Sequence, residues 1–210
     1  LLIAGPKARD LLSGVARGDW SAVAFPWLSV RQAFIGIAPA TVMAVSFSGE
    51  VAFELHIELP YLYSAYKALQ SAGAEVGLSL FGSMAVESMR MEKGYLHWKS
   101  ELITEFNPFE AGLDRFVNMD KDFIGKTALS AQASSGLRQQ LVMLDIDSTT
   151  VPAHGGSSVM LDDKVIGTVT AGAWGYRIKR NLAFAYIDPK YATIGSQMTI
   201  DMLGDRVKAT

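Results

Sequence analysis

Residues 87–102 read ESMRMEKGYLHWKSEL and place one arginine among methionines, just ahead of aromatic side chains. Arg90 follows Glu87 by three residues, so its simplest use is an ion pair on one helix face, worth about 0.5 kcal/mol or less when exposed. A guanidinium also binds a carboxylate through two hydrogen bonds or stacks on a flat ring. Tyr95 and Trp98 could supply stacking surface or could be core residues, and pattern alone favours the core. These residues outline a candidate pocket for a flat, anionic ligand.

The segment VAFELHIEL, residues 51–59, contains a second candidate group, Glu54. Its residues alternate like a strand with one buried face, and the apolar positions are Val51, Phe53, Leu55, Ile57 and Leu59. Glu54 shares the opposite face with His56 and Glu58, and the pattern favours solvent exposure for that face. A carboxylate has two acceptor oxygens, so Glu54 would also suit a ligand edge with two N–H donors, such as an aminopyrimidine.

The rest of the chain lacks the motifs of several common site types. It has no G-x-G-x-x-G turn, no P-loop and no G-x-S-x-G nucleophile motif. The histidines His56, His97 and His154 lack metal-ligand spacing, and the absence of cysteine excludes disulfides, thiolate ligands and a cysteine nucleophile. A net charge of −2 without a Lys/Arg block argues against nucleic acid as a partner. No apolar run approaches the ~18 residues of a membrane span, so a membrane partner is not expected either.

The elements that must position these groups form an α+β pattern in the first part of the chain. Pro6 suits the first turn of a helix over residues 6–16, and the apolar N-terminus LLIAGPKARD is typical of a strand that runs into that helix. We therefore expect the chain to begin in the middle of a domain. Strands are predicted over 31–37, 40–48 and 51–59, the second buried on both faces because it is almost wholly apolar, and helices over 60–73, closed by Gly73, and 81–93.

After about residue 125 the pattern changes to short strands. A helix over 125–136 ends in serines and glycine, and five strands separated by Gly, Asp and Pro turns follow, over 139–147, 157–161, 164–172, 181–187 and 197–203. This pattern is typical of a small antiparallel sheet or barrel. We place the domain boundary near Gly136, which gives domains 1–136 and 137–210.

Several longer segments resemble the glycine-cleavage T-protein (aminomethyltransferase) family. They are GEVAFELHIELPYLYSAYKAL, SMAVESMRMEKGYLHWKSEL, NPFEAGLDRFVNMDKDFIGKTAL and IGTVTAGAWGYRIKRNLAFAYID, and LIAGPKARDLL is similar to the family's Leu-Gln-Gly-Pro-Lys-Ala segment. Together they cover essentially the whole chain in the family's order. Within the family, MEKGYLHWKSEL and EAGLDRFV are most similar to the folate-binding C-terminal half of dimethylglycine and sarcosine dehydrogenase-like proteins.

The resemblance implies an N-terminally truncated, folate-binding T-protein-like domain followed by a small antiparallel β-barrel. It implies tetrahydrofolate as the cofactor, with FAD only in an upstream domain, and folate and a small amine-derived one-carbon donor as partners. The family's pterin-binding glutamate falls on Glu54, with Glu50 the second choice, its folate-contacting arginine on Arg90 and a closing aromatic on Trp98. Its catalytic aspartate is expected upstream of this chain, so residues 1–210 alone should be inactive and bind folate weakly. The compartment would be the cytoplasm in a bacterium or the mitochondrial matrix in a eukaryote.

Some positions depart from the family pattern. Val51 or Ala52 stands where glycine is frequent, Arg115 replaces a tryptophan, and Lys99 replaces a glycine. Two alternatives stay open: a non-catalytic folate-binding protein that assists iron–sulfur assembly, and a folate-dependent demethylase of the same fold. The first usually carries Lys-Gly-Cys-Tyr-x-Gly-Gln, where this chain has EKGYLHWKSEL.

Overall fold

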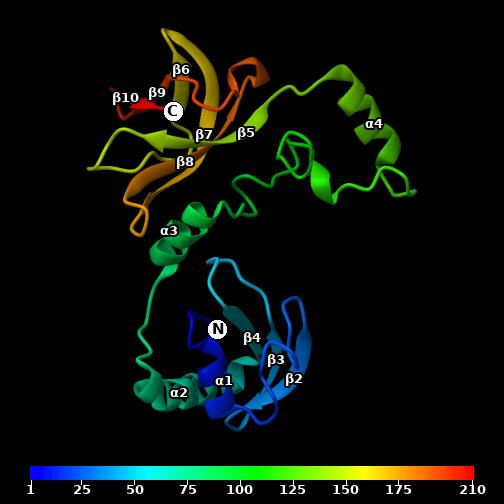
Figure 1. The fold of residues 1–210 in the computed structure, drawn as a ribbon, viewed down its shortest axis with the longest axis vertical. Coiled ribbons are helices and arrows are strands. Elements are labelled where there is room, and N and C mark those ends of the chain that lie inside the picture. The colour runs from blue at the N-terminus through cyan, green and yellow to red at the C-terminus, as the bar shows by residue number, and fades with distance from the viewer. The chain divides into compact units, whose positions relative to one another are not determined.

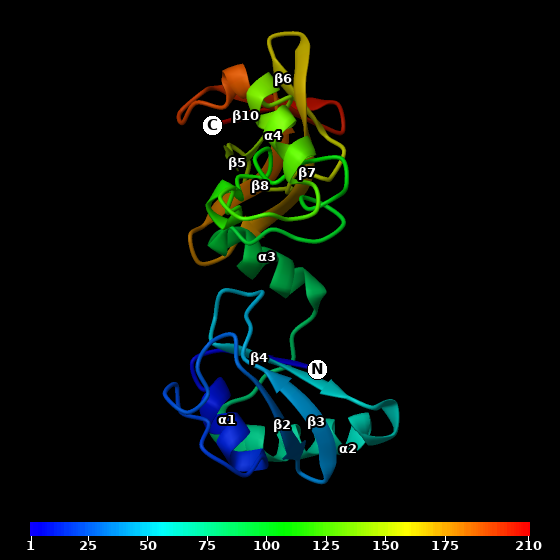
Figure 2. The same cartoon turned by 90° about the vertical axis from the view of Figure 1, so that its right-hand side faces the viewer.

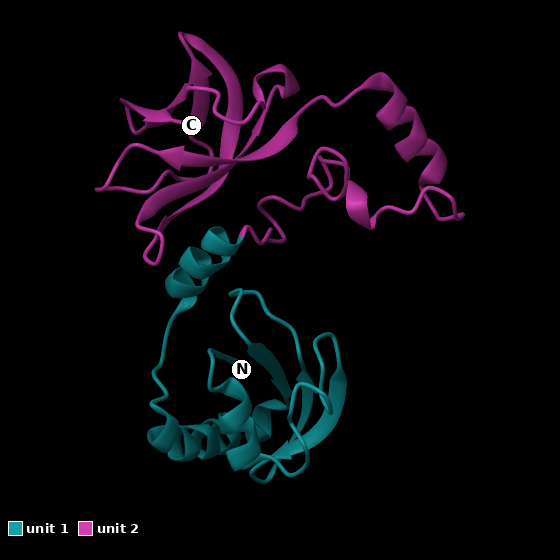
Figure 3. Cartoon of the chain, in the orientation of Figure 1, with its two compact units in different colours: residues 1–93 teal, residues 94–210 magenta.

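The computed structural model describes residues 1–210 and contains two compact units, Leu1–Lys93 and Gly94–Thr210 (Figure 3). A four-stranded antiparallel sheet lies at the centre of the first unit (Figures 1 and 2). Its order is β1-β4-β3-β2, with β1 at Leu2–Ala4, β2 at Val30–Ile35, β3 at Ala38–Met43 and β4 at Ala52–Ile57. The helices of this unit are α1 (Ala8–Val15), α2 (Leu59–Val76) and α3 (Ser83–Lys93). Helices α1 and α2 pack on one face of the sheet and form the core with it.

The alternation predicted for the strand around Glu54 is confirmed only within β4, because Val51 and Leu59 lie outside the strand and are 45% and 81% exposed, with Leu59 beginning α2. Phe53 and Leu55 of β4 are buried in the core under α1 and α2, whereas Glu54 and His56 lie on the other face of the sheet. Strand β3 corrects an expectation, because it is not buried on both faces. Its inward positions are fully buried, but Thr41 and its neighbours on the other face stay partly accessible, since only one face of the sheet is covered by helices.

The end of α2 also differs from the sequence prediction. Gly73 does not close this helix; it lies inside α2, and the helix continues to Val76. Gly77, with φ of 76°, takes the left-handed position that ends the helix. A Cβ on Gly73 would lie 2.4 Å from Leu78 Cδ2, so this glycine is required by close packing and not by the helix end.

The second unit contains a closed antiparallel barrel, which confirms the predicted β unit. Its strands follow the order β10-β5-β8-β7-β6-β9 around the barrel. Their bounds are β5 Gln140–Ile146, β6 Ser158–Leu161, β7 Lys164–Gly175, β8 Arg180–Ile187, β9 Met198–Met202 and β10 Asp205–Ala209. Val159, Ile187 and Ile200 are among the fully buried residues of its core. Strand β10 was not predicted, because its sequence DRVKA is mainly charged and only Val207 and Ala209 can face a core.

The segment that precedes the barrel in the second unit is mostly irregular. It contains a 3₁₀ helix at Asp114–Phe116 and helix α4 at Lys126–Ser135, and a second 3₁₀ helix, Pro189–Tyr191, follows β8. The chain from Gly94 onward belongs to the same compact unit as the barrel. A domain boundary near Gly136 therefore stays a prediction, with α4 ending just before it and β5 beginning just after.

Candidate functional site

Glu54 lies in the middle of β4, on the sheet face that α1 and α2 leave uncovered. Its side chain is 41% exposed, and its Oε2 lies 3.0 Å from Nε2 of His56, two residues along the same strand. Leu2 of β1 and Met43 of β3 are its direct neighbours across the sheet. The other carboxylate oxygen, Oε1, has no hydrogen-bond partner within the chain. Glu54 thus presents one free acceptor between two apolar side chains.

Arg90 lies near the end of α3 and is only 1% exposed. Its Nε donates to Oε2 of Glu87 at 2.7 Å, which is the ion pair expected from their spacing. Its guanidinium carbon is also 5.8 Å from the centre of the Phe47 ring, which belongs to the loop between β3 and β4. Because this arginine is buried and its Glu87 partner is 38% exposed, the contact is not the weak surface pair of the simplest interpretation.

The loop between β3 and β4 links the surroundings of Arg90 to the strand that carries Glu54. Phe47, which lies under the Arg90 guanidinium, precedes Glu54 by seven residues, a span of at most about 25 Å. Gly49 of the same loop packs so closely on Lys93 of α3 that a Cβ there would lie 2.6 Å from Lys93 Cγ. A common cavity for Glu54 and Arg90 remains a prediction, and the contacts of this loop are what favour it.

Trp98 belongs to the second unit and is 74% exposed. It lies in a tight turn, where the carbonyl oxygen of His97 accepts hydrogen bonds from three amides, those of Ser100, Glu101 and Leu102. Lys99, directly after Trp98, has φ of 72°, a left-handed conformation that favours glycine. Lys99 therefore occupies a backbone position that glycine would adopt with less strain.

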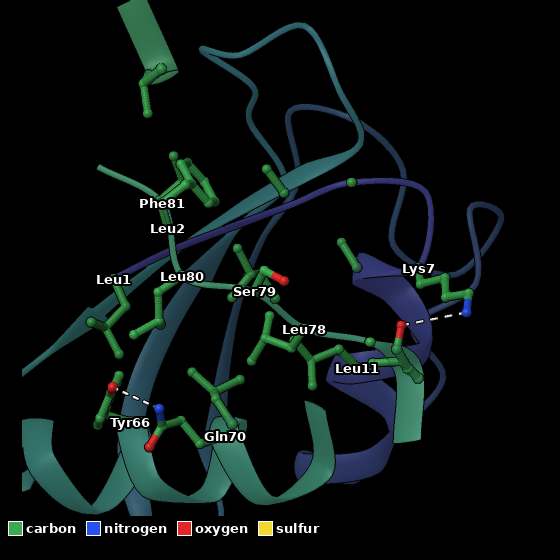
Figure 4. Close-up of a pocket in the computed structure, with 18 of the residues that line it drawn as sticks. Leu1, Leu2, Lys7, Leu11, Tyr66, Gln70, Leu78, Ser79, Leu80 and Phe81 are labelled. Carbon is green, nitrogen blue, oxygen red and sulfur yellow. Dashed lines mark hydrogen bonds between the residues drawn. The ribbon is translucent and has the colours of Figure 1, made fainter. Parts of the chain in front are cut away.

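The first unit also contains a cavity of about 690 Å³ between α2, the N-terminal strand and the segment that follows α2 (Figure 4). Figure 4 shows Leu78, Leu80 and Phe81 on one side of it and Tyr66 and Gln70 of α2 below, with the Gln70 amide donating to the Tyr66 hydroxyl at 2.7 Å. At another edge Lys7 Nζ lies 3.4 Å from the carbonyl oxygen of Val76. None of the three predicted site residues lines this mainly aliphatic cavity.

Glu101 is a buried acidic residue that the sequence did not single out. It has no exposed surface, and its carboxylate accepts from the His97 amide at 2.8 Å, the Ser100 hydroxyl at 3.0 Å and the Thr170 hydroxyl at 2.7 Å. Its backbone carbonyl accepts from the Tyr186 hydroxyl at 2.8 Å. Burial raises the pKa of Tyr186, and the nearby Glu101 and Glu110 carboxylates raise it further, so the phenol stays protonated and donates.

A second buried carboxylate, Glu110, organises the segment NPFEAGL. The Asn107 side chain accepts from the amides of Phe109 and Glu110, and Glu110 Oε2 accepts from the Asn107 amide at 2.9 Å, which is a reciprocal capping arrangement. The Arg138 guanidinium binds both oxygens of Glu110, at 3.0 and 3.1 Å. Burial alone would raise the pKa of Glu110, but the hydrogen bonds from Arg138 and Asn107 hold this pKa below its usual value. The N-x-x-E spacing is a sequence signal that could have identified this cap.

The structure contains no cluster of three or more His, Cys, Asp or Glu side chains suited to a metal ion. None of its helices combines the length and the apolar character that crossing a membrane requires.

The fold and the candidate residues define an α+β protein with a C-terminal antiparallel barrel. Two family profiles match it: one described as the GCVT N-terminal domain over residues 1–121, and one described as the glycine cleavage T-protein C-terminal barrel domain over residues 139–210. The chain belongs to the glycine cleavage T-protein family, as the resemblance of its motifs indicates. An aminomethyltransferase T structure from Bartonella henselae shares the fold, with a TM-score of 0.57 and 16% identity over 99% of this chain and 81% of that one.

Curated relatives include both dehydrogenases and transferases. The chain is 36% identical to the mitochondrial dimethylglycine dehydrogenase of Mus musculus, over 99% of this chain and 24% of that protein. It is 34% identical to the mitochondrial sarcosine dehydrogenase of Mus musculus, over 97% of this chain and 22% of that protein. It is 33% identical to an aminomethyltransferase of Thermoanaerobacter pseudethanolicus, over 100% of this chain and 56% of that protein. The chain thus spans about a quarter of the dehydrogenases and about half of the transferase.

Proposed function

We propose that residues 1–210 are the tetrahydrofolate-binding part of an enzyme that transfers a one-carbon unit from an amine to folate. The two family domains in their family order support this proposal. The observation that carries it furthest is the Glu54 carboxylate, which is partly exposed beside Leu2 and Met43 and keeps Oε1 without a partner. A pterin offers such a group two adjacent N–H donors and a flat ring that apolar neighbours can cover.

Glu54 and Arg90, both in the first unit, have proposed roles toward the cofactor. Glu54 would accept hydrogen bonds from the aminopyrimidine edge, and the Arg90 guanidinium would attract the anionic part of the folate. Trp98 belongs to the second unit, where its exposed ring has the flat surface that stacking on a ligand ring requires. When bound, tetrahydrofolate supplies the nitrogen nucleophile that accepts the one-carbon unit. The protein's part is then to hold that nitrogen in place, exclude water and keep a carboxylate near developing positive charge.

The proposed one-carbon donor is an N-methylated glycine, because two of the relatives carry dimethylglycine and sarcosine in their names. In such an enzyme a flavin would supply the oxidation of the N-methyl group, and the residues of this chain would hold the folate that accepts the one-carbon unit. We assign no residue of the chain as the catalytic acid or base.

The test is a titration of the ¹⁵N-labelled chain with 5-formyltetrahydrofolate, followed by amide chemical shifts. We expect saturable shifts in β4 and in the loop that precedes it. Glu54→Gln should weaken binding about tenfold, because a charged hydrogen-bond acceptor is lost. Glu75→Gln, an exposed carboxylate of α2 on the helix-covered side of the sheet, is the matched control and should bind like the wild type. Absence of saturable binding by the wild type, or equal losses in both variants, would overturn the proposal.

A further inference from the structure

We propose that Glu101 is a positioning residue that locks the turn bearing Trp98 onto the barrel and so holds this side chain ready to stack on a ligand ring. The inference deepens the proposed function and rests on it for the identity of the ligand. It concerns the second unit alone, to which Trp98, Glu101 and the barrel strands all belong.

The turn by itself is a strained and exposed piece of backbone. Lys99 adopts a left-handed conformation that is unfavourable for a residue with a Cβ. Trp98 is 74% exposed, so its ring gains little from packing that could hold the turn in place. Without a further constraint, a turn of this kind would sample other conformations, and a stacking aromatic would lose its defined position.

The Glu101 carboxylate supplies that constraint from two directions. Its Oε2 closes the turn on itself, because it accepts from the amide of His97 and the hydroxyl of Ser100, the residues on either side of Trp98 and Lys99. Its Oε1 reaches the barrel, where it accepts from the Thr170 hydroxyl of β7. Because the carboxylate is completely buried, each of these hydrogen bonds is costly to leave unmade.

The barrel is shaped to meet this carboxylate. The register of β7 against β8 shifts between Val169 and Ala171, so Thr170 is the extra residue of a β-bulge. A bulge turns a side chain away from its normal direction in the sheet. The Thr170 hydroxyl has one proton and lies 3.3 Å from the Phe184 carbonyl oxygen but 2.7 Å from the Glu101 carboxylate. The shorter and charged acceptor takes the proton, so the bulge holds a donor for Glu101.

Tyr186 adds a second attachment to the barrel one strand away. Its hydroxyl donates to the Glu101 backbone carbonyl, and its ring stacks on Phe106 with the ring centres 3.5 Å apart. Glu101 is therefore bound to β7 through its side chain and to β8 through its backbone. Two attachments at one residue, three positions after Trp98, restrict both the place and the direction of the turn.

The experiment follows the indole N–H signal of Trp98, assigned with a Trp98→Phe variant, and the affinity for 5-formyltetrahydrofolate in the same samples. Thr170→Val removes the hydroxyl with little change in shape, and Glu101→Gln removes the charge. In both we expect the Trp98 indole signal to shift and broaden and folate binding to weaken about tenfold. Thr170→Ser keeps the hydroxyl, so its Trp98 indole signal and its folate affinity should match those of the wild type. Thr199→Val, the same substitution on β9 of the barrel, should leave the indole signal and the affinity unchanged.

An unchanged Trp98 signal in Thr170→Val and Glu101→Gln would overturn the positioning role. The positioning role would also be overturned if the wild type binds folate and both variants bind it equally well despite a shifted Trp98 signal. If Glu101→Gln fails to fold, Thr170→Val and Ser100→Ala, which removes the donor at 3.0 Å, decide the matter. Failure of the wild type to bind the folate would refute the proposed function, and the Trp98 signal would then decide whether Glu101 locks the turn.

Discussion

Lys99 has a strained backbone conformation within the turn that bears Trp98. Its φ of 72° is poorly tolerated by a side chain, and the side chain is exposed, so it contributes little packing in return. We expect Lys99→Gly to stabilise the protein by about 0.5–1 kcal/mol, the relief of strain less the greater chain entropy of glycine when unfolded. The measurement is the midpoint of urea unfolding of the barrel unit. Lys121→Gly, an exposed lysine without a positive φ, is the control and should give no gain. A urea midpoint for Lys99→Gly below that of the wild type would show that Lys99 does not strain the backbone.

Glu110 should make the folding stability of the protein depend on pH, and the direction of its pKa shift gives the sign of this dependence. Its pKa is held below the ordinary value of 4.5, so its ionised form stabilises the fold fully above about pH 4.5. This contribution is lost as the pH falls through the lower pKa of the folded state. Glu110→Gln should therefore cost about 1–2 kcal/mol near neutral pH, and the difference from the wild type should shrink as the pH falls below 4.5 and Glu110 becomes protonated.

Urea unfolding at several pH values measures this difference. Glu105→Gln, an exposed carboxylate in the same segment, is the control and should have little effect at any pH. A cost for Glu110→Gln that stays constant down to the lowest pH would show that the ionised carboxylate is not what stabilises the segment.

The residues that could be predicted from the sequence differ in kind from those that could not. Glu54 and Arg90 are candidates because the family's folate-binding residues fall on them in segments that resemble the family, and their role in binding stays a prediction. Glu101 was not a candidate, because its partner Thr170 is 69 residues away and is aimed by a β-bulge that no local pattern announces. Hydrogen bonds between distant segments are fixed by the fold, so a single sequence without structural context leaves them unseen.

At the level of elements, α2 illustrates how packing overrides a simple rule. A glycine after an apolar helical pattern predicts a helix end, yet Gly73 lies inside α2, where Leu78 fills the space of a Cβ. The barrel strands with alternating apolar residues were predicted, whereas β10 was not. Strand β10 exists because β5 and β9 supply its hydrogen-bond partners, and pairing of this kind does not require an apolar sequence.

Two glycines in the first unit should respond oppositely to the same substitution. Gly14→Ala in α1 should raise stability by about 0.5–1 kcal/mol, since its Cβ would meet only Ala72 at 3.6 Å. Gly73→Ala should lower stability despite its better helix propensity, because its Cβ would lie 2.5 Å from Leu78 Cβ. Thermal unfolding of the two variants gives the comparison. A gain for Gly73→Ala would show that Leu78 can move away without cost.

At the scale of the whole molecule, the apolar core is divided between the two units. One core consists of residues from α1, α2 and the sheet together with loop residues such as Trp20 and Phe25, and the other consists of barrel residues together with the loop residue Ala153. Leu12 and Ile200 are both fully buried, each in its own core. Each side chain contributes mainly to the stability of the unit that surrounds it, because a cavity removes contacts only from its neighbours.

Ile200→Ala should therefore destabilise the barrel by about 2–5 kcal/mol and leave the sheet of the first unit largely unaffected. Leu12→Ala is the matched substitution in the other core and should do the reverse. Native-state hydrogen exchange reports both units in one sample, because protected amides of β5–β9 and of β2–β4 give separate free energies of opening. We expect Ile200→Ala to lower protection in the barrel strands and Leu12→Ala to lower it in the sheet strands. An equal loss in both sets of strands from either substitution would show that the two cores unfold as one cooperative unit, since only then does a cavity in one lower the opening free energy of the other.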